Sequence, residues 1–201
     1  MIMLYTWPTP NGLKVSIMLE ELGIEYLEHP IDIHQGAQHS AEFAEISPTR
    51  KIPVLRDSSA GVTLIESNAI LLYLAEKHRR FLPLDPLKKI DAISWLMWQG
   101  AALGPMAGQA NFFHFFNPGK SEFAEEKFLT TVRKLYGVLE DKLLGNTYIC
   151  GDYSIVDMAC YPWIARHTRI GIQPDEYPNV FRWYETVGQR AAVRKAFEAK
   201  P

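Results

Sequence analysis

The first eighty residues alternate strand-like runs with helical segments, whereas the rest of the chain shows helical patterns alone. Ile2–Thr6 is a short apolar run typical of a buried strand, and Lys14–Leu22 then adopts the apolar spacing of a helix. Gly23 can end that helix in a left-handed conformation, and Tyr26–Ile33 is again strand-like. Two strands joined through a helix run parallel, so this unit restricts the beginning of the chain to an α/β fold.

A hairpin and a further helix complete this first part. Ile52–Leu55 and Val62–Ile65 are strand-like and are separated by the turn-forming segment Asp57–Gly61. Ser67 offers an N-cap for a helix over Ala69–Lys77. This order predicts a mixed four-stranded sheet with one parallel pair and one antiparallel hairpin, which is the thioredoxin-like architecture.

The segment Phe81–Pro86 separates this part from the helical remainder, because its two prolines prevent a continuous helix. We therefore predict an α/β domain over residues 1–79, a linker over 80–87 and an all-helical domain over 88–201. Within the helical domain, Gly104-Pro105 is expected to kink or break a helix.

The composition excludes several classes of partner. The net charge is −2, whereas nucleic acids and anionic membranes select a basic face. No apolar run approaches the ~20 residues that a membrane span needs. With only Cys150 and Cys160, a disulfide framework is excluded and a cytoplasmic location is expected. The histidines form no metal-binding signature, so no metal is expected.

The turn Thr9-Pro10-Asn11-Gly12 follows the first predicted strand, where a thioredoxin-like fold would carry a Cys-x-x-Cys motif. It contains no cysteine. A protein of this fold cannot perform thiol chemistry with its own side chain at this position. Any thiol used here must come from a bound molecule, and glutathione is the expected source.

Further motifs occur in a specific order. They are Lys51-Ile52-Pro53, Glu66-Ser67 at the start of a helix, and Ser154 with Asp157 in the helical half. With this order and spacing, the chain resembles the cytosolic glutathione transferases over essentially its full length. The turn Thr9–Gly12, Ser47-Pro48 and Gly104–Met106 near Gln109 are similar to the bacterial nu class, which resembles the fungal prion-like transferases. The resemblance implies glutathione-dependent disulfide reduction, with peroxidase and weak conjugating activity beside it.

A site for glutathione needs an acid for the ligand's ammonium and donors for its two carboxylates. Glu66 can meet the ammonium, and Ser67 with the following helix N-terminus can receive the γ-glutamyl carboxylate. The alternative is that Ser67 only caps its helix and Glu66 is a surface acid. Ile52-Pro53 is the best candidate for a cis peptide, with the Ile52 backbone bonding the cysteinyl part of the ligand. The alternative is an ordinary trans proline entering an edge strand.

The resemblance also implies contacts from more variable positions. Lys51 and Gln38 are expected to serve the glycyl carboxylate, with Arg50 as a competitor for that role. Gln99 is expected toward a site between the domains. The resemblance also implies a basic contact from the long helix of the second domain, where Lys134 and the adjacent Arg133 are the candidates and the register is open.

Thr9 and Asn11 are the predicted catalytic residues, because a hydroxyl and an amide can donate hydrogen bonds to a thiolate. Both precede or open a predicted helix, whose N-terminal dipole adds positive potential. Gly12 leaves space for a close approach. The alternative is that Thr9 and Asn11 are competing helix caps, and Tyr5 is the rival activator because other transferase classes use a tyrosine near the end of the first strand.

The acceptor side is assigned to the helical domain, where residues 112–116 are almost entirely aromatic. Consecutive bulky side chains cannot all face one way in a helix, so we expect some of them to pack and others to line an exposed cleft or a subunit interface. The predicted acceptor pocket comprises Phe112, Phe113, His114, Phe115, Trp163 and Arg166.

The leading hypothesis is therefore an enzyme that reduces small or protein disulfides with glutathione as cosubstrate, two glutathione molecules acting together. One alternative is a glutathione S-transferase that conjugates electrophiles. An alternative of another class is a non-catalytic glutathione-binding regulatory protein. The resemblance implies a homodimer in each case.

Overall fold

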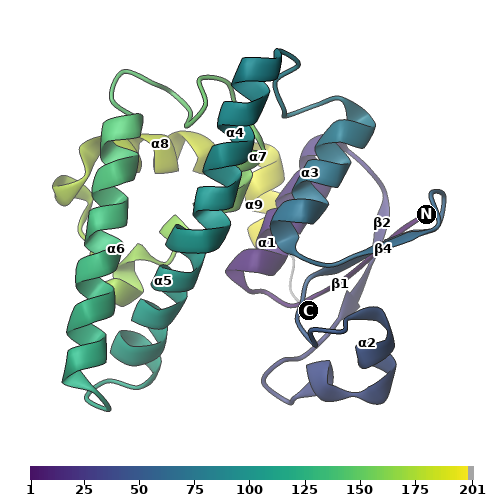
Figure 1. The fold of residues 1–201 in the computed structure, drawn as a ribbon, viewed down its shortest axis with the longest axis horizontal. Helices are drawn as coiled ribbons and strands as arrows, with labels where there is room; N and C mark the ends of the chain where they lie inside the picture. The colour runs from purple at the N-terminus through teal and green to yellow at the C-terminus, as the bar shows by residue number, and fades with distance from the viewer. Residues whose placement is uncertain (199–201) are drawn as a thin grey trace. The chain divides into compact units, whose positions relative to one another are not determined.

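The computed structural model describes residues 1–198. In this part of the chain, four strands form one mixed sheet in the order β2-β1-β3-β4 (Figure 1). They are β1 (Ile2–Thr6), β2 (Tyr26–Pro30), β3 (Val54–Asp57) and β4 (Val62–Leu64). β1 pairs with β2 in parallel, and the other neighbours are antiparallel. The predicted thioredoxin-like architecture is confirmed.

Helices cover both faces of this sheet. α1 (Pro10–Leu22) and α3 (Ser67–His78) pack together, and the short 3-10 helix η1 (Ala37–His39) and α2 (Ala41–Ile46) follow β2. Because side chains alternate along a strand, Leu4 and Thr6 of β1 share one face and Tyr5 lies on the other. Tyr5 packs against a cluster that includes Phe43 of α2, so α2 covers the face opposite to Leu4 and Thr6.

The last helix, α9 (Ala191–Glu198), packs against α1. Two ion pairs hold this segment to α1: Arg190, just before α9, to Glu21 at 2.5 Å, and Lys195 of α9 to Glu20 at 2.6 Å. The described chain accordingly divides into a first unit of Met1–Arg80 with residues 190–198, and a second unit of Phe81–Gln189. The second unit thus lacks the last segment of the helical domain predicted over 88–201. The predicted domain boundaries stay a prediction, and residues 199–201 lie outside the described part.

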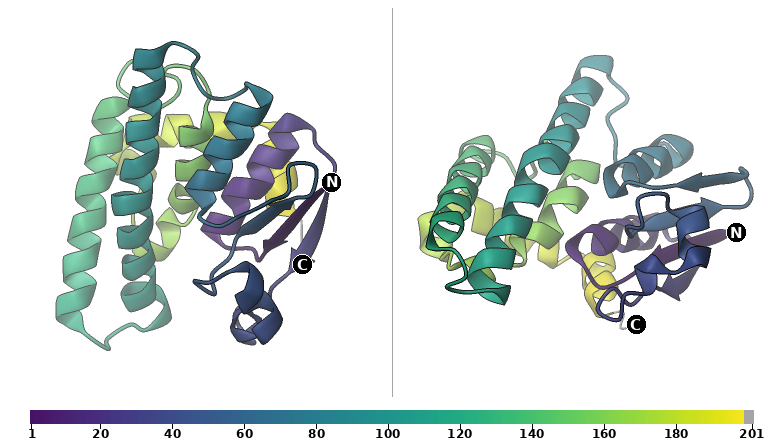
Figure 2. Two further views of the ribbon diagram at one scale, coloured as in Figure 1. Left: turned by 45° about the vertical axis from the view of Figure 1, so that its right-hand side comes forward. Right: turned by 60° about the horizontal axis from the view of Figure 1, so that its bottom comes forward.

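The second unit is helical (Figure 2). Its elements are α4 (Pro86–Trp98), the π-helix η2 (Gln99–Leu103), α5 (Gly104–Ala110), the π-helix η3 (Asn111–Phe116), α6 (Glu122–Lys142), α7 (Ile155–Ile164), the 3-10 helices η4 (His167–Ile170) and η5 (Pro174–Glu176), and α8 (Pro178–Gly188). The predicted break at Gly104-Pro105 does not occur, because the π-helical turn η2 precedes it. The Gly104 N–H donates to Gln99 O, five residues back, and the helix continues past Pro105.

A buried carboxylate, that of Asp157, joins several segments of this helical unit by hydrogen bonds. Asp157 and Ser154 form the predicted capping box at the start of α7. Asp157 also accepts hydrogen bonds from the Ile149 N–H at 3.0 Å and from Trp183 Nε1 at 2.8 Å. Burial raises the pKa of the Asp157 carboxyl. Among residues 1–198, no helix is both long and apolar enough to cross a membrane.

Candidate functional site

The strand register brings the predicted glutathione segments of the first unit to one end of the sheet. Tyr5, next to the end of β1, pairs with Val54, the first residue of β3. Leu64, the last residue of β4, pairs with Leu55. Since β1 and β2 are parallel, the turn after β1, the loop after β2, the segment before β3 and the start of α3 all lie at this end (Figure 1).

Thr9 caps α1: its Oγ1 accepts a hydrogen bond from the Gly12 N–H at 3.2 Å. A threonine hydroxyl that accepts one bond still carries its own proton, so capping leaves Thr9 able to donate to a ligand. Gly12 serves the packing of the turn rather than a ligand, because a Cβ at this position would collide with Thr6 Oγ1 and the Trp7 carbonyl oxygen. The interpretation of Gly12 as space for a ligand was therefore wrong.

Asn11 is the second residue of α1 and is half-buried. Pro10 precedes it at the first helical position, where a missing N–H costs no helical hydrogen bond. The described turn thus presents a hydroxyl, an amide side chain and a helix N-terminus at one place, and each favours negative charge.

Tyr5 lies elsewhere. Its ring packs against His29 of β2, with ring centroids 5.2 Å apart, and against the apolar cluster of the α2 face. Thr6 points to the opposite face, where it meets Gly12 of α1. The structure thus separates the Tyr5 ring from the start of α1.

Ile52-Pro53 is a cis peptide, as predicted. The segment before it is held by Ser47, which is buried: Ser47 Oγ donates to the Lys51 carbonyl at 2.9 Å and accepts from the Lys51 N–H at 3.2 Å. Sequence reasoning used Ser47 only as part of a family signature. A serine that opens a turn commonly bonds the backbone of that turn, and this is the signal that could have revealed its role.

The N-cap of α3 lies one residue earlier than predicted, and this changes the positions of Glu66 and Ser67. Glu66, and not Ser67, is the N-cap of α3, with φ 68° and no hydrogen bond from its side chain to the helix. A non-glycine residue in this region is uncommon and often marks a functional position. Ser67 is the first helical residue, and its hydroxyl accepts a bond from Lys14 Nζ at 3.2 Å. The expectation that Ser67 caps the helix was wrong.

The residues predicted for the glycyl carboxylate lie in the loop after β2 and before β3. Arg50 donates from its guanidinium to the His39 carbonyl at 3.0 Å, which ties these two loops together. Lys51 is exposed. Gln38 donates from Nε2 to the Ile33 carbonyl at 3.4 Å, while its Oε1 is buried without a hydrogen-bond partner in residues 1–198.

Gln99 and Arg133, the two residues of the helical unit that were predicted to contact glutathione, lie beside other residues of this unit. Gln99 is buried at the start of η2, and a Cβ at Gly104 would lie 3.0 Å from its Nε2. Arg133 of α6 donates to Glu176 Oε1 at 2.5 Å and to the Gly171 carbonyl at 3.3 Å. The assignment of Gln99 and Arg133 to glutathione stays a prediction.

The aromatic run of η3 divides into packed and exposed rings, whereas the predicted cleft or subunit interface stays a prediction. Phe113 stacks on Phe128 of α6 at 5.7 Å, whereas Phe112 and Phe115 are each about half exposed. Arg169 lies over the Phe115 ring at 4.8 Å. His114 Nδ1 bonds Glu125 Oε1 at 2.6 Å, and this bond lowers the pKa of the Glu125 carboxyl.

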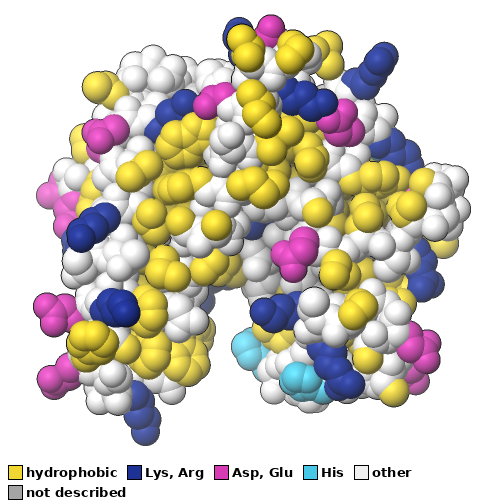
Figure 3. All heavy atoms as spheres, viewed as in Figure 1, with side chains coloured by type: hydrophobic (Ala, Val, Ile, Leu, Met, Phe, Trp, Pro, Cys, Tyr) yellow, Lys and Arg dark blue, Asp and Glu magenta, His cyan; other side chains and the backbone are white. Residues whose placement is uncertain are grey.

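The other two predicted acceptor residues come from α7 and the turn that follows it. Trp163 packs over α5, where Cβ atoms at Gly104 and Gly108 would lie 3.4 Å and 3.5 Å from its ring. Burial, and then the nearby charge of Arg169, lower the pKa of the Arg166 guanidinium. In Figure 3, apolar side chains gather over the helical unit.

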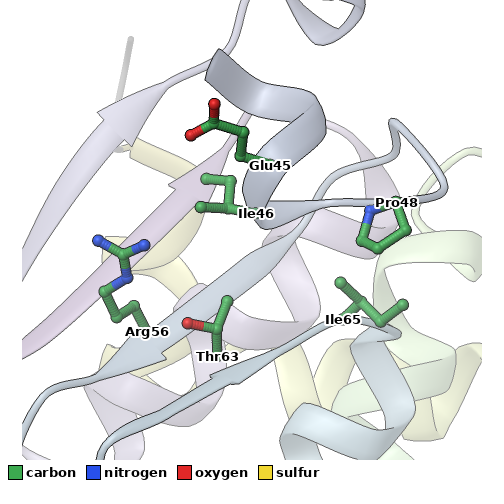
Figure 4. A pocket seen from close by; sticks show the side chains of 6 residues that line it. All are labelled: Glu45, Ile46, Pro48, Arg56, Thr63 and Ile65. Carbon is green, nitrogen blue, oxygen red and sulfur yellow. The ribbon is translucent and has the colours of Figure 1, made fainter. Parts of the chain in front are cut away.

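A hollow of about 320 Å³ lies between α2 and the β3–β4 hairpin (Figure 4). Its lining residues are Glu45, Ile46, Pro48, Arg56, Thr63 and Ile65. It therefore contains none of the residues assigned above to glutathione or to the acceptor. In the described chain, no group of three or more His, Cys, Asp or Glu side chains could hold a metal ion.

Two family models match the chain. Residues 1–76 match the model described as glutathione S-transferase, N-terminal domain, and residues 103–191 match glutathione S-transferase, C-terminal domain. These matches agree with the mixed sheet of the first unit and the helices of the second.

Individual relatives are similar over nearly the whole chain. The disulfide-bond oxidoreductase YfcG of Escherichia coli is 40% identical, with 98% of this chain and 94% of the relative covered. A glutathione transferase structure from Burkholderia graminis, with two glutathione molecules bound per subunit, is 36% identical with a TM-score of 0.92, covering 98% of this chain and 88% of that one. A Pseudomonas putida structure with one glutathione disulfide per subunit is 36% identical with a TM-score of 0.93, covering 100% and 92%.

Proposed function

This chain belongs to the glutathione S-transferase family, and we propose that it is an enzyme that reduces disulfides with glutathione. The observation that carries the proposal is the turn at the start of α1. It offers two neutral donors, Thr9 and Asn11, and no cysteine. The disulfide-bond oxidoreductase YfcG and the structures that hold two glutathione molecules or glutathione disulfide support it.

The proposed roles of the first unit follow from its charges and donors. Glu66 meets the ammonium of glutathione, and Ser67 with the N-terminus of α3 receives the γ-glutamyl carboxylate. The backbone of Ile52 bonds the cysteinyl part, and Lys51 and Gln38 serve the glycyl end. Bound in this way, the ligand reaches from α3 across the sheet end to the turn at Thr9.

Thr9 and Asn11 then favour the thiolate of glutathione. A free thiol with a pKa of ~8.5 is mostly protonated at neutral pH, and only its thiolate attacks a disulfide well. Hydrogen bonds from the Thr9 hydroxyl and the Asn11 amide, with the positive end of α1, stabilise the charged form and lower that pKa.

The reaction consumes two glutathione molecules, because reduction of a disulfide takes two electrons and each glutathione thiol supplies one. Since the turn has no protein thiol, the mixed disulfide forms on glutathione itself. The first thiolate attacks one sulfur of the acceptor R–S–S–R, forms a mixed disulfide with glutathione and releases RS⁻. A second glutathione thiolate attacks the glutathione sulfur of the mixed disulfide and releases the other RS⁻. Both products are protonated by the two protons that the glutathione thiols lost, so the acceptor gains two electrons and glutathione disulfide forms.

We assign the acceptor to the helical unit, to Phe112, His114 and Phe115 of η3 and to Trp163 and Arg166; Phe112 and Phe115 are each about half exposed. Exposed aromatic rings can pack against apolar substituents in several orientations. The same residues could therefore bind an aromatic electrophile, which would allow weak conjugation to glutathione. Relative turnover of disulfides and of electrophilic substrates separates the two activities.

We also propose that the enzyme is a cytoplasmic homodimer. α4 exposes Leu87, Ile90 and Met97, whose spacing places them along one helix face. An apolar stripe of this kind supports association with a second subunit. Light scattering of the native chain and of Ile90→Glu tests it, and a monomeric wild type would contradict it.

The central test is glutathione-dependent turnover of bis(2-hydroxyethyl) disulfide by the wild type, Thr9→Ala, Asn11→Ala and the double variant. We expect the double variant to lose at least about 100-fold in kcat/KM, as when preorganised donors to a developing charge are removed. Thr9→Ser keeps the hydroxyl and should retain most of the rate.

Thr63→Ala, exposed on β4, is the matched control and should keep the wild-type rate. The pH at half-maximal rate should also rise in Asn11→Ala, because the thiolate loses a donor. Unchanged rates in the double variant would refute the assigned roles. No heat on titration of the wild type with glutathione would favour a non-catalytic regulatory protein.

A further inference from the structure

Lys14 is a lysine buried inside α1, with only 2% of its surface exposed. Lysine is almost never fully buried in proteins unless its ammonium is hydrogen-bonded. Here Nζ reaches the start of α3, where it donates to Ser67 Oγ at 3.2 Å and to Asn68 Oδ1 at 2.9 Å. These are the first two residues of the helix that the proposed function assigns to the γ-glutamyl carboxylate.

The first consequence concerns the direction of the Ser67 hydroxyl. A serine hydroxyl has one proton and two acceptor positions, whereas an ammonium can only donate. The Ser67 oxygen must therefore be the acceptor of the bond with Lys14, and its proton points to another partner. Lys14 in this way makes Ser67 a donor toward a ligand oxygen, which is what binding of a carboxylate requires.

The second consequence is electrostatic. A helix N-terminus carries partial positive charge, so a cation beside it is unfavourable and an anion is favourable. No side chain caps the N-terminus of α3, and the Lys14 ammonium lies against the first two residues of this helix. A buried ammonium acts through a medium of low dielectric constant, where its field is stronger than in water. A carboxylate bound at the start of α3 would be attracted both by the helix N-terminus and by this ammonium.

We propose that Lys14 is a positioning residue for glutathione: it orients the Ser67 hydroxyl toward the γ-glutamyl carboxylate and holds a positive charge beneath it. The inference rests on the proposed function, because it assigns a further residue to the same glutathione site. Lys14 stands behind Ser67 and Asn68 and acts on the ligand through them and through its field.

The test compares two ligands. Glutathione carries the carboxylate in question, and γ-aminobutyryl-cysteinylglycine lacks only that group while it keeps the ammonium. Dissociation constants of both are measured by calorimetry for the wild type and Lys14→Met. We expect the substitution to weaken glutathione binding about tenfold or more and analogue binding less than twofold, since a charge-assisted contact is lost only where the carboxylate is present.

Further variants separate positioning from simple stability. Lys14→Gln removes the charge but keeps an N–H donor, so its preference for glutathione over the analogue should lie between those of the wild type and Lys14→Met. Lys14→Arg keeps the charge and should restore part of this preference. Ser67→Ala should weaken glutathione binding in the wild type and much less in Lys14→Met, because the two act together. Lys195→Met, which breaks the ion pair with Glu20 in the same unit, is the control and should leave both constants unchanged.

Lys14→Gln answers the question if Lys14→Met does not fold. Equal weakening of the two ligands, or an unchanged ratio of their dissociation constants, overturns the inference: Lys14 then only joins α1 to α3. A wild type that binds neither ligand overturns the proposed function and this inference with it. If the wild type and Lys14→Met both prefer glutathione over the analogue by the same factor, the role of Lys14 is refuted and the proposed function stands.

Discussion

The two units of this protein use their buried polar groups in opposite ways. In the first unit, Lys14 and Ser47 are buried and hold segments that reach one end of the sheet, where ligand donors gather. In the second unit, Asp157 is buried and its partners all belong to the centre of that unit. The difference teaches that burial of a polar side chain does not by itself mark a site; the location of its partners does.

The largest expected effect tests this contrast in the helical unit. Asp157→Ala removes the acceptor of bonds from Ile149, Ser154 and Trp183 and leaves buried donors unsatisfied. We expect a loss of about 3 kcal/mol in the free energy of unfolding. Chemical denaturation measures it, with Asp141→Ala on the exposed side of α6 as the control.

Glutathione affinity of the folded Asp157→Ala variant should stay within twofold of the wild type, because Ile149, Ser154 and Trp183, which donate to Asp157, all belong to the second unit. A large loss of affinity at unchanged stability would break the contrast between the units.

A substitution in the first unit should affect stability and binding together. Gly12→Ala places a methyl group against Thr6 Oγ1 and the Trp7 carbonyl, which forces the turn at Thr9 to move. We expect a loss of about 2 kcal/mol in the free energy of unfolding and at least about tenfold weaker glutathione binding, because the donors move with the turn.

The matched control for Gly12 is Gly137→Ala in α6. Apart from its two chain neighbours and the nearby backbone of its own helix, no atom of the described chain lies within 4 Å of the new methyl group, so this change should stabilise the protein by up to about 1 kcal/mol. Wild-type affinity for glutathione in Gly12→Ala would show that the turn does not position the ligand.

Much of the fold and of the candidate site could be predicted from the sequence, and what could not be predicted depends on tertiary contacts. The strand order, the Ser154–Asp157 capping box and the cis bond before Pro53 followed from pattern and family resemblance. Ser67 was expected to cap α3, because serine favours that position and the left-handed conformation of Glu66 leaves no trace in a sequence. Tertiary bonds, here the one from Lys14, decide between such local alternatives.

The burial of Lys14 and the packing of α9 against α1 were not predicted, although the sequence contains indications of both. Lys14 stands within Leu13–Leu19, a stretch that is buried on all sides of its helix, and a lysine inside such a stretch must be buried with it. The amphipathic period of α9 shows an apolar face but not which unit it covers. The acidic pair at the end of α1 and the basic residues Arg190 and Lys195 were the available indication.

The pH dependence of stability gives a smaller effect, confined to the first unit. Burial would raise the pKa of the Asp57 carboxyl, but hydrogen bonds from Lys77, Ser59 and Tyr73 outweigh it and hold that pKa well below its usual range. An acid with a lowered pKa in the folded state stabilises the protein above its unfolded pKa of ~4, and this contribution is lost as the pH falls below that value.

We therefore expect the wild type to lose about 1–2 kcal/mol more than Asp57→Asn between about pH 5 and pH 2, a figure reduced because the Lys77 ammonium is partly exposed. Denaturant midpoints measured across this range check it. Parallel pH profiles of the two proteins would mean that the Asp57 carboxyl is not held in its charged form.

The smallest expected effect on stability lies in the aromatic run of the helical unit, and it sharpens the contrast between side chains that fold a unit and side chains that meet a ligand. Phe113 stacks on Phe128, so Phe113→Ala should cost about 1–2 kcal/mol of stability. Phe115 is about half exposed beneath Arg169, so Phe115→Ala should change stability by no more than about 0.5 kcal/mol.

If the exposed rings meet the acceptor, Phe115→Ala should raise the KM for an aromatic disulfide about threefold while the KM for bis(2-hydroxyethyl) disulfide stays unchanged, because only the aromatic substrate loses apolar contact. Phe123→Ala, 76% exposed on α6, is the control and should change neither KM. Steady-state kinetics with both substrates decides the point. Identical KM values in the wild type and Phe115→Ala would exclude Phe115 from the acceptor site and leave its ring as exposed surface in contact with Arg169 and Phe116.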